Sequence, residues 1–232
     1  MNTFWLPGAL LALTLLLPAL PAQAGRPLVT EDAGVLGGGE CELESVAARE
    51  RARDVPTVRS ASAQVGCGIG WRSQVALFAG RSSSEGVRTE DVALVGKSAL
   101  IELTDDKPGV VLAWALGASR ERGASFKHES SELKAVYTHP LGDWLLHGNL
   151  GWTRSEADKL NTTIWSVAAE RTGLGPFDLM GEVFGDDRGD PWLNAGLRFT
   201  AIAERLFIDA SYGRQMNSGR ARLMTLGLKF TF

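Results

Sequence analysis

The sequence contains little of what metal, redox or phosphate chemistry requires. It has two cysteines and three histidines in 232 residues, and His128, His139 and His147 lack the spacing of a metal site. No serine stands in a G-x-S-x-G nucleophile elbow. Neither Gly34–Gly39 nor the P-loop-like Gly96–Ser98 lies between a strand and a helix, as a nucleotide site requires. We therefore expect no metal, no cofactor and no enzymatic activity.

An excess of positive charge is also absent. The chain carries 24 lysines and arginines against 27 aspartates and glutamates, so its formal net charge is −3. A nucleic-acid-binding face needs enough basic side chains to neutralise several phosphates, and clusters such as Arg49, Arg51 and Arg53 are small. We expect no nucleic-acid partner.

Charged side chains are missing from the first 24 residues. The apolar run Ala9–Leu17 is ended by Pro18, and Ala22-Gln23-Ala24 follows it with the A-x-A pattern of a cleavage site. This pattern predicts a secretory signal peptide over residues 1–24, since the run is too short for a spanning helix. No later apolar stretch reaches 18 residues, which excludes a helical membrane protein.

The rest of the chain alternates apolar and polar residues over short segments. Near the C-terminal end, for example, Met224, Leu226 and Leu228 fall on one face, whereas Thr225 and Lys229 fall on the other. We find twelve such segments, at about 40–51, 57–68, 73–84, 89–102, 109–121, 128–139, 144–156, 160–171, 177–186, 191–201, 205–216 and 220–232. An even number of roughly ten-residue strands predicts an all-β fold, a closed antiparallel up-and-down transmembrane β-barrel.

The apolar faces of these segments indicate contact with outer-membrane lipid. The soluble alternative, a secreted β-sandwich, would carry charged outer faces, whereas these faces include aromatic residues such as Trp144, Trp192 and Phe232. Tryptophan near strand ends is typical of an interfacial girdle. We predict a protein of the bacterial outer membrane, with a periplasmic N-terminal segment over residues 25–39 and a barrel over residues 40–232.

The connections between the segments alternate in character. Tight turns form one set, and more polar connections, such as those near Asp54 and Glu85, form the other. With the N-terminal segment in the periplasm, the tight turns would be periplasmic and the polar set extracellular. The alternating last strand ends at Phe232 and resembles the C-terminal signal of outer-membrane barrels, so we expect the barrel-assembly machinery as a partner.

Stretches near both ends of the chain carry a family resemblance. The sequence RPLVTEDAG at Arg26–Gly34, followed by Gly37–Gly39, directly precedes the first predicted strand. Near the C-terminal end stand GLRF at Gly196–Phe199 and LFIDASYG at Leu206–Gly213. These residues resemble the outer-membrane proteins of the family labelled "meta-pathway of phenol degradation". The resemblance implies a bacterial outer-membrane barrel that is associated with the catabolism of aromatic compounds and acts in uptake.

The two cysteines depart from that family's pattern. Cys41 lies in the first predicted strand and Cys67 near the end of the second, at equal distances from the turn at Asp54. In a symmetric hairpin they face each other, and a non-hydrogen-bonded antiparallel pair brings Cα atoms to about 4.5 Å, within disulfide range. Because the periplasm is oxidising, we predict a Cys41–Cys67 disulfide, with two free buried thiols as the alternative.

Charged side chains on the polar faces are expected to point into the lumen. Glu182, Arg198, Asp209 and Lys229 lie on four successive strands, and we predict that they form one ion-pair network, because a guanidinium can bridge two carboxylates. Further lumen-facing candidates are Glu42, Glu44, Lys97, Glu132, Lys134, His147 and Glu170. The network can serve the structure or line a solute path, and both interpretations stay open at this point.

Two functions follow from this arrangement. The first is a narrow channel or transporter for small solutes, with aromatic compounds suggested by the family resemblance. The second is a structural barrel whose lumen is closed by the ion-pair network. A twelve-stranded barrel lies between eight-stranded barrels that side chains fill and sixteen-stranded aqueous porins, so the strand number alone does not separate them.

Overall fold

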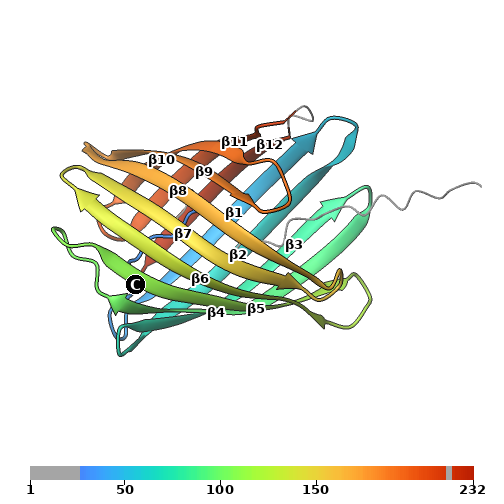
Figure 1. The fold of residues 1–232 in the computed structure, drawn as a ribbon, viewed down its shortest axis with the longest axis horizontal. Helices are drawn as coiled ribbons and strands as arrows, with labels where there is room; N and C mark the ends of the chain where they lie inside the picture. The colour runs from blue at the N-terminus through green and yellow to red at the C-terminus, as the bar shows by residue number, and fades with distance from the viewer. Residues whose placement is uncertain (1–26, 218–220) are drawn as a thin grey trace, which may run out of the picture.

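The computed structural model describes residues 27–217 and 221–232 of the chain, which form one closed β-barrel (Figure 1). The predicted signal peptide, residues 1–24, lies outside the described residues. Within the part that the structure describes, no helix is long and apolar enough to cross a membrane.

Twelve antiparallel strands follow one another around the barrel in chain order, and β12 closes the ring by pairing with β1. Their bounds are β1 (Cys41–Ala52), β2 (Val55–Gly70), β3 (Ser73–Ser84), β4 (Val87–Ile101), β5 (Gly109–Glu121), β6 (Lys127–Leu141), β7 (Trp144–Ser155), β8 (Leu160–Leu174), β9 (Phe177–Asp186), β10 (Trp192–Ile202), β11 (Leu206–Gln215) and β12 (Arg222–Thr231). The predicted fold class and strand number are therefore confirmed.

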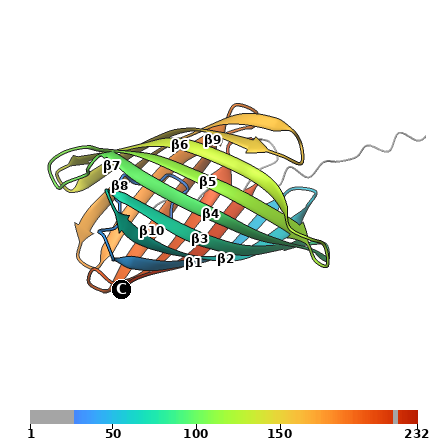
Figure 2. The same ribbon diagram turned by 90° about the horizontal axis from the view of Figure 1, so that it is seen from below.

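The barrel has two ends, which we call the terminal end and the distal end. At the terminal end, Cys41 at the start of β1 exchanges backbone hydrogen bonds with the C-terminal residue, Phe232. The five connections from β2 to β3, β4 to β5, β6 to β7, β8 to β9 and β10 to β11 also lie there (Figures 1 and 2). The distal end carries the other hairpin connections, beginning with the one around Asp54.

The outer surface of the barrel is an apolar belt. Leu77 on β3, Leu94 on β4 and Leu116 on β5 occupy one cross-strand row, and their side chains are 69%, 43% and 50% exposed. So large a contiguous apolar surface would be unfavourable in water and matches the lipid-facing band of a transmembrane barrel. The alternation that predicts the strands therefore also sets which face contacts lipid.

One residue of the predicted aromatic girdle lies on the opposite face. Trp192 pairs in the ladder with Phe184, and it shares the inner face of β10 with the buried Asn194. The rings of Trp192 and Phe184 stack with centroids 6.1 Å apart. The assignment of Trp192 to the lipid-facing side was wrong, because side chains two apart on a strand share a face, and Asn194 points inward.

The predicted disulfide is present. Cys41 and Cys67 are cross-strand partners, their sulfur atoms are bonded and their Cα atoms lie 4.1 Å apart. The register that the turn at Asp54 predicts also holds beyond the bridge, since Leu43 faces Val65.

We expect a maleimide reagent to leave the urea-unfolded protein unlabelled until a reductant is added, because both cysteines are engaged in the bridge. Mass spectrometry counts the labels: none before reduction and two after it. Labelling of unreduced protein would contradict the bridge.

Candidate functional site in the barrel lumen

Residues 27–40, which we call the internal segment, run into the barrel: residues 27–36 lie in the lumen, and residues 37–40 are exposed at the terminal end. Leu28 packs against Ala168 and Met180 of β8 and β9, and Ala33 lies in a buried apolar cluster with residues of β5 and β6. These contacts come from inner faces of the wall. The sequence places this segment ahead of the barrel, whereas in space it occupies the lumen.

Glu182 on β9 holds the start of the internal segment. The backbone N–H groups of Val29 and Thr30 each donate to its carboxylate at 2.8 Å, and the Thr30 hydroxyl donates at 2.6 Å. Asn194 on β10 donates from its side-chain amide at 2.7 Å. A carboxylate that is only 3% exposed needs such a set of donors to offset its lost hydration.

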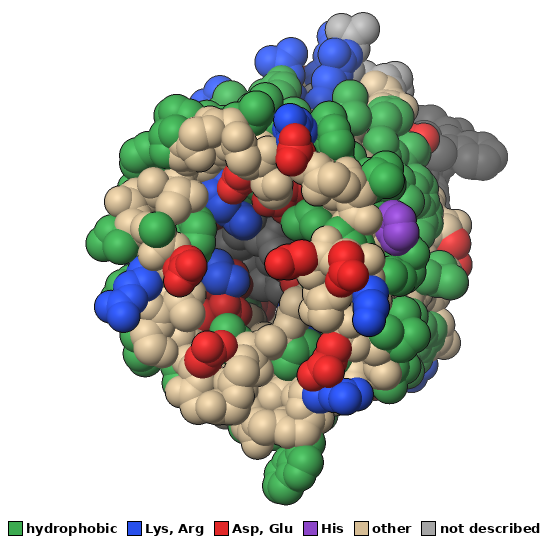
Figure 3. All heavy atoms as spheres, turned by 90° about the vertical axis from the view of Figure 1, so that its left-hand side faces the viewer, with side chains coloured by type: hydrophobic (Ala, Val, Ile, Leu, Met, Phe, Trp, Pro, Cys, Tyr) green, Lys and Arg blue, Asp and Glu red, His purple; other side chains and the backbone are tan. Residues whose placement is uncertain are grey.

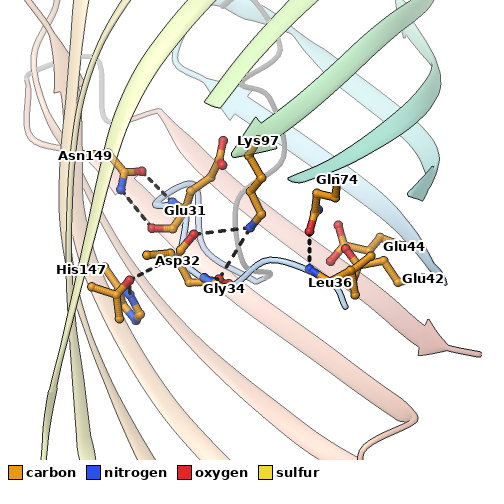
Figure 4. A network of polar contacts seen from close by, with 12 residues as sticks. Glu31, Asp32, Gly34, Leu36, Glu42, Glu44, Gln74, Lys97, His147 and Asn149 are labelled. Carbon is orange, nitrogen blue, oxygen red and sulfur yellow. Dashed lines mark hydrogen bonds and ion pairs between the residues drawn. The ribbon is translucent and has the colours of Figure 1, made fainter. Parts of the chain in front are cut away.

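Uncharged side chains of three strands bind the middle of the segment (Figure 4). Asn149 on β7 accepts a hydrogen bond from the N–H of Glu31 at 2.7 Å and donates to its carbonyl at 3.0 Å. Thr138 on β6 accepts from the N–H of Ala33, and Gln74 on β3 from the N–H of Leu36, each at 2.8 Å. The segment forms no continuous ladder with a strand, so these side chains satisfy backbone groups that would otherwise be buried without partners.

Two lysines join the segment to the wall by charge. The Lys134 ammonium on β6 lies 3.1 Å from the Glu31 carboxylate and 2.8 Å from that of Glu132. The Lys97 ammonium on β4 lies 3.7 Å from the Asp32 carboxylate. The side chains of Lys134, Glu31 and Glu132 are all at least nine-tenths buried, so each charge depends on its partner.

The segment reaches the wall at the terminal end. Gly38 forms a parallel bridge with Gly68 on β2, and Gly39 donates to the carbonyl of Gly68 at 2.9 Å. A Cβ atom on Gly68 would lie 2.0 Å from the carbonyl oxygen of Gly37. Only glycine permits this approach, because any side chain at position 68 would overlap the segment's backbone.

A polar cavity remains between the segment and one side of the wall. Its volume is about 30 Å³, enough for about two water molecules. It is lined mainly by polar and charged side chains, namely Glu31, Asp32, Glu42, Glu44, Gln64, Gln74, Lys97 and Lys229. Figure 3 looks at the terminal end and shows a hollow bordered by acidic and basic side chains.

The four residues of the predicted ion-pair network have different partners. Glu182 binds the internal segment, as above. Arg198 lies 3.7 Å from the carboxylate of Glu170, and the Lys229 ammonium lies 2.6 Å from Glu42. Asp209 is buried beside Arg198 in the ladder. The wall carboxylate Glu182 thus contacts the segment instead of Arg198.

The other predicted lumen residues lie on the inner face. Lys229 also approaches Glu44 at 3.7 Å, whereas Lys97, Glu132 and Lys134 surround the segment. His147 shares a 2.9 Å hydrogen bond between Nδ1 and the Thr138 hydroxyl and lies 3.8 Å from Glu170. Sequence reasoning missed Gln74 and Thr138, which bind the segment, and Asn194, which donates to Glu182. Their position on the polar face of a strand is the signal that could have found them.

Comparisons with known proteins identify a family and a fold for this chain. A family model described as "Uncharacterised conserved protein UCP029691" matches residues 12–232. No curated protein matches the sequence. The description of this family does not mention phenol degradation, so that resemblance stays a prediction.

Solved structures with this fold include a porin, an outer-membrane channel and the translocator domain of an autotransporter. The NanC porin is similar with a TM-score of 0.61 at 10% identity over 81% of this chain and 98% of its own. The outer-membrane channel COG4313 from Pseudomonas putida F1 has a TM-score of 0.60 at 11% identity, over 87% and 98%. The translocator domain of the autotransporter NalP from Neisseria meningitidis has a TM-score of 0.57 at 14% identity, over 84% and 89%.

These similarities show the fold of bacterial outer-membrane β-barrels. With the apolar belt, they place the chain in the outer membrane. The same fold carries porins and a translocator domain, so the fold alone does not decide what passes through the lumen.

Proposed function

The chain belongs to the family described as uncharacterised conserved protein UCP029691, and because that description names no activity, we propose a function from the lumen itself. The protein is a narrow outer-membrane channel in which small solutes pass beside the internal segment. The observation that carries this proposal is the placement of that segment: hydrogen bonds hold it to β6, β7 and β9, and the polar cavity lies between it and β12 and β1–β4, from which Gln74 and Lys97 also reach it.

The lining of the cavity favours cations over anions. Four carboxylates, those of Glu31, Asp32, Glu42 and Glu44, face two ammonium groups, those of Lys97 and Lys229. Each of these lysines is within ion-pair distance of a carboxylate, and Glu31 shares Lys134 with Glu132. Five carboxylates therefore stand against three ammonium groups, so the net charge is negative. Rings of carboxylates select cations in known channels, and we expect the same sign of selectivity here.

Small aromatic solutes are the first class to test. The stacked pair Phe184 and Trp192 lies on the inner face of β9 and β10 toward the distal end, where a flat apolar ring could stack beside it. The family resemblance suggests the same solutes. A neutral phenol would meet no charge barrier in the lining.

Single-channel recording of residues 25–232, refolded into a planar lipid bilayer, tests the proposal. A heat-dependent shift in gel mobility first verifies that the barrel is folded. We expect small discrete conductance steps and a reversal potential of cation-selective sign in a salt gradient. Silence from a verified barrel would contradict the channel and favour the second function.

The second function is a non-conducting structural barrel. One observation favours it: the hydrogen bonds to Glu182, Asn149, Thr138 and Gln74 hold the segment across the lumen. Replacing Arg198 by alanine separates the two functions. In a channel, this loss of an inward charge changes the conductance or its selectivity, whereas in a closed barrel it changes only the unfolding midpoint.

A further inference from the structure

The outer face of the barrel changes from apolar to basic toward the distal end. On β4, the outward residues Leu94 and Val92 give way, toward the distal end, to Glu90 and Arg88. The same change occurs on the other two strands in the same direction. The outward residues are Leu77, Ala79 and Arg81 on β3, and Val65, Ala63, Ala61 and Arg59 on β2. The same boundary occurs at one height on adjacent strands, because their registers align these residues.

The arginines form continuous cross-strand rows. One row runs Arg49, Arg59, Ser83 and Arg88; a second runs Ala61, Arg81, Glu90 and Arg120; a third runs Arg51, Arg222 and Arg214. We call the eight arginines of these rows the arginine band. It spans seven adjacent strands, from β11 through β12 and β1 to β5.

Most of this charge has no internal partner. Within residues 27–217 and 221–232, Arg120 is the one member of the band that forms an ion pair, with Glu90. On the other side of the barrel, the outward Arg154 pairs with Glu156. Hydrogen bonds from Lys159 and Arg154 lower the pKa of Glu156 to about 2. Arg154 is thus paired locally, as Arg120 is, whereas the other seven arginines of the band form no ion pair among the described residues.

A hollow lies within the band. Its volume is about 530 Å³. Its charged lining consists of Arg59, Arg81 and Arg88, Arg122 of the connection between β5 and β6, and one carboxylate, Glu90. The guanidinium group presents several N–H donors in a planar fork, which matches the oxygens of a phosphate. A hollow of this composition fits a phosphorylated headgroup.

We propose that the arginine band binds the phosphate groups of an anionic lipid in the outer leaflet. The band borders the apolar belt on the flank of the barrel, so one ligand can place phosphates on the arginines and acyl chains on Leu77, Leu94 and Leu116. A soluble polyanion would contact the arginines but not the apolar belt. The proposal rests on the outer-membrane location with the distal end outward, and not on conduction.

Binding of a glucosamine lipid with two phosphates to the detergent-solubilised barrel tests this inference. The probe is bisphosphorylated lipid A in a neutral maltoside detergent, compared with its monophosphorylated form. The test variant is Arg59→Gln/Arg81→Gln/Arg88→Gln. The matched control, Arg72→Gln/Lys107→Gln/Arg205→Gln, removes the same charge at the terminal end.

We expect the test variant to bind the bisphosphorylated lipid at least tenfold more weakly, the control to bind as the wild type does, and the monophosphorylated form to bind more weakly than the bisphosphorylated one. Equal affinity of the test variant and the control would overturn the proposal. So would competition by inorganic phosphate or a soluble polyphosphate at the same concentration as the lipid, since the ligand would then be a soluble anion.

Folding of each variant is verified by the heat-dependent mobility shift. If the triple variant yields no folded barrel, the single variants Arg81→Gln and Arg88→Gln replace it, with Lys107→Gln as the control. A measurable loss of affinity in both single variants supports the band, and unchanged affinity in both overturns it.

Discussion

Deleting residues 27–38 is expected to raise the single-channel conductance several-fold. These residues occupy the lumen and contact its inner face at β8 and β9 through Leu28 and at β5 and β6 through Ala33. The diameter of a barrel grows with its number of strands, so a twelve-stranded barrel is wider than an eight-stranded one, whose interior is filled by side chains. Gly39 and Glu40 stay in place, so the start of β1 and its pairing with Phe232 are preserved.

The control replaces residues 27–38 by a Gly-Ser sequence of equal length. It keeps the chain volume but loses the side chains of Leu28, Glu31 and Asp32, so its conductance should fluctuate between closed and open levels. A single substitution, Gly68→Val, is also expected to raise the conductance. The valine side chain would overlap the carbonyl of Gly37 and displace the segment from the wall. An unchanged conductance in the deletion variant would contradict the role of the segment as the constriction.

The sequence was sufficient to predict the barrel because one physical rule determines most of it. Side chains alternate between lipid and lumen at every strand, and a one-residue slip would reverse that assignment. Leu77 and Leu94 therefore identify the outer face, and the position of Cys67 relative to Cys41 identifies a register. The error at Trp192 came from reading the residue type instead of its position on β10.

The internal segment could not be predicted in the same way. Residues 27–40 have no periodic pattern, and their partners are distant in sequence: Val29 and Glu182 are 153 residues apart, and Glu31 and Lys134 are 103 apart. Glu182 was predicted to point inward, but it binds two backbone N–H groups, and no pattern of side chains reveals such an acceptor. Charge complementarity predicted a partner for Glu182 on a neighbouring strand instead.

The arginine band illustrates a second limit. In the sequence, Arg49, Arg51 and Arg53 form a small cluster, and the net charge is slightly negative. The registers of β1 to β4 then bring Arg59 and Arg88 into the row of Arg49. A basic surface can thus be assembled from residues that no sequence window joins.

Replacing Lys134 by methionine is expected to destabilise the folded barrel by about 3–5 kcal/mol, because removal of one partner leaves buried charges uncompensated. The Lys134 ammonium is 4% exposed and contacts both Glu31 and Glu132, which are 5% and 9% exposed. Urea unfolding of the protein in phosphatidylcholine vesicles, followed by tryptophan fluorescence, measures the change. Lys127→Met is the matched control, since Lys127 lies exposed on the same strand and should change stability little.

A second substitution distinguishes lost charge pairing from lost packing. Glu31→Gln added to Lys134→Met removes one of the two unpaired carboxylates, so part of the lost stability should return. Residues in one ion-pair network couple in double-mutant cycles by about 0.5–3 kcal/mol. Simple additivity of the two substitutions would show that Glu31 and Lys134 act independently, and the segment would then be held by Glu182, Asn149 and Thr138 without help from this charge pair.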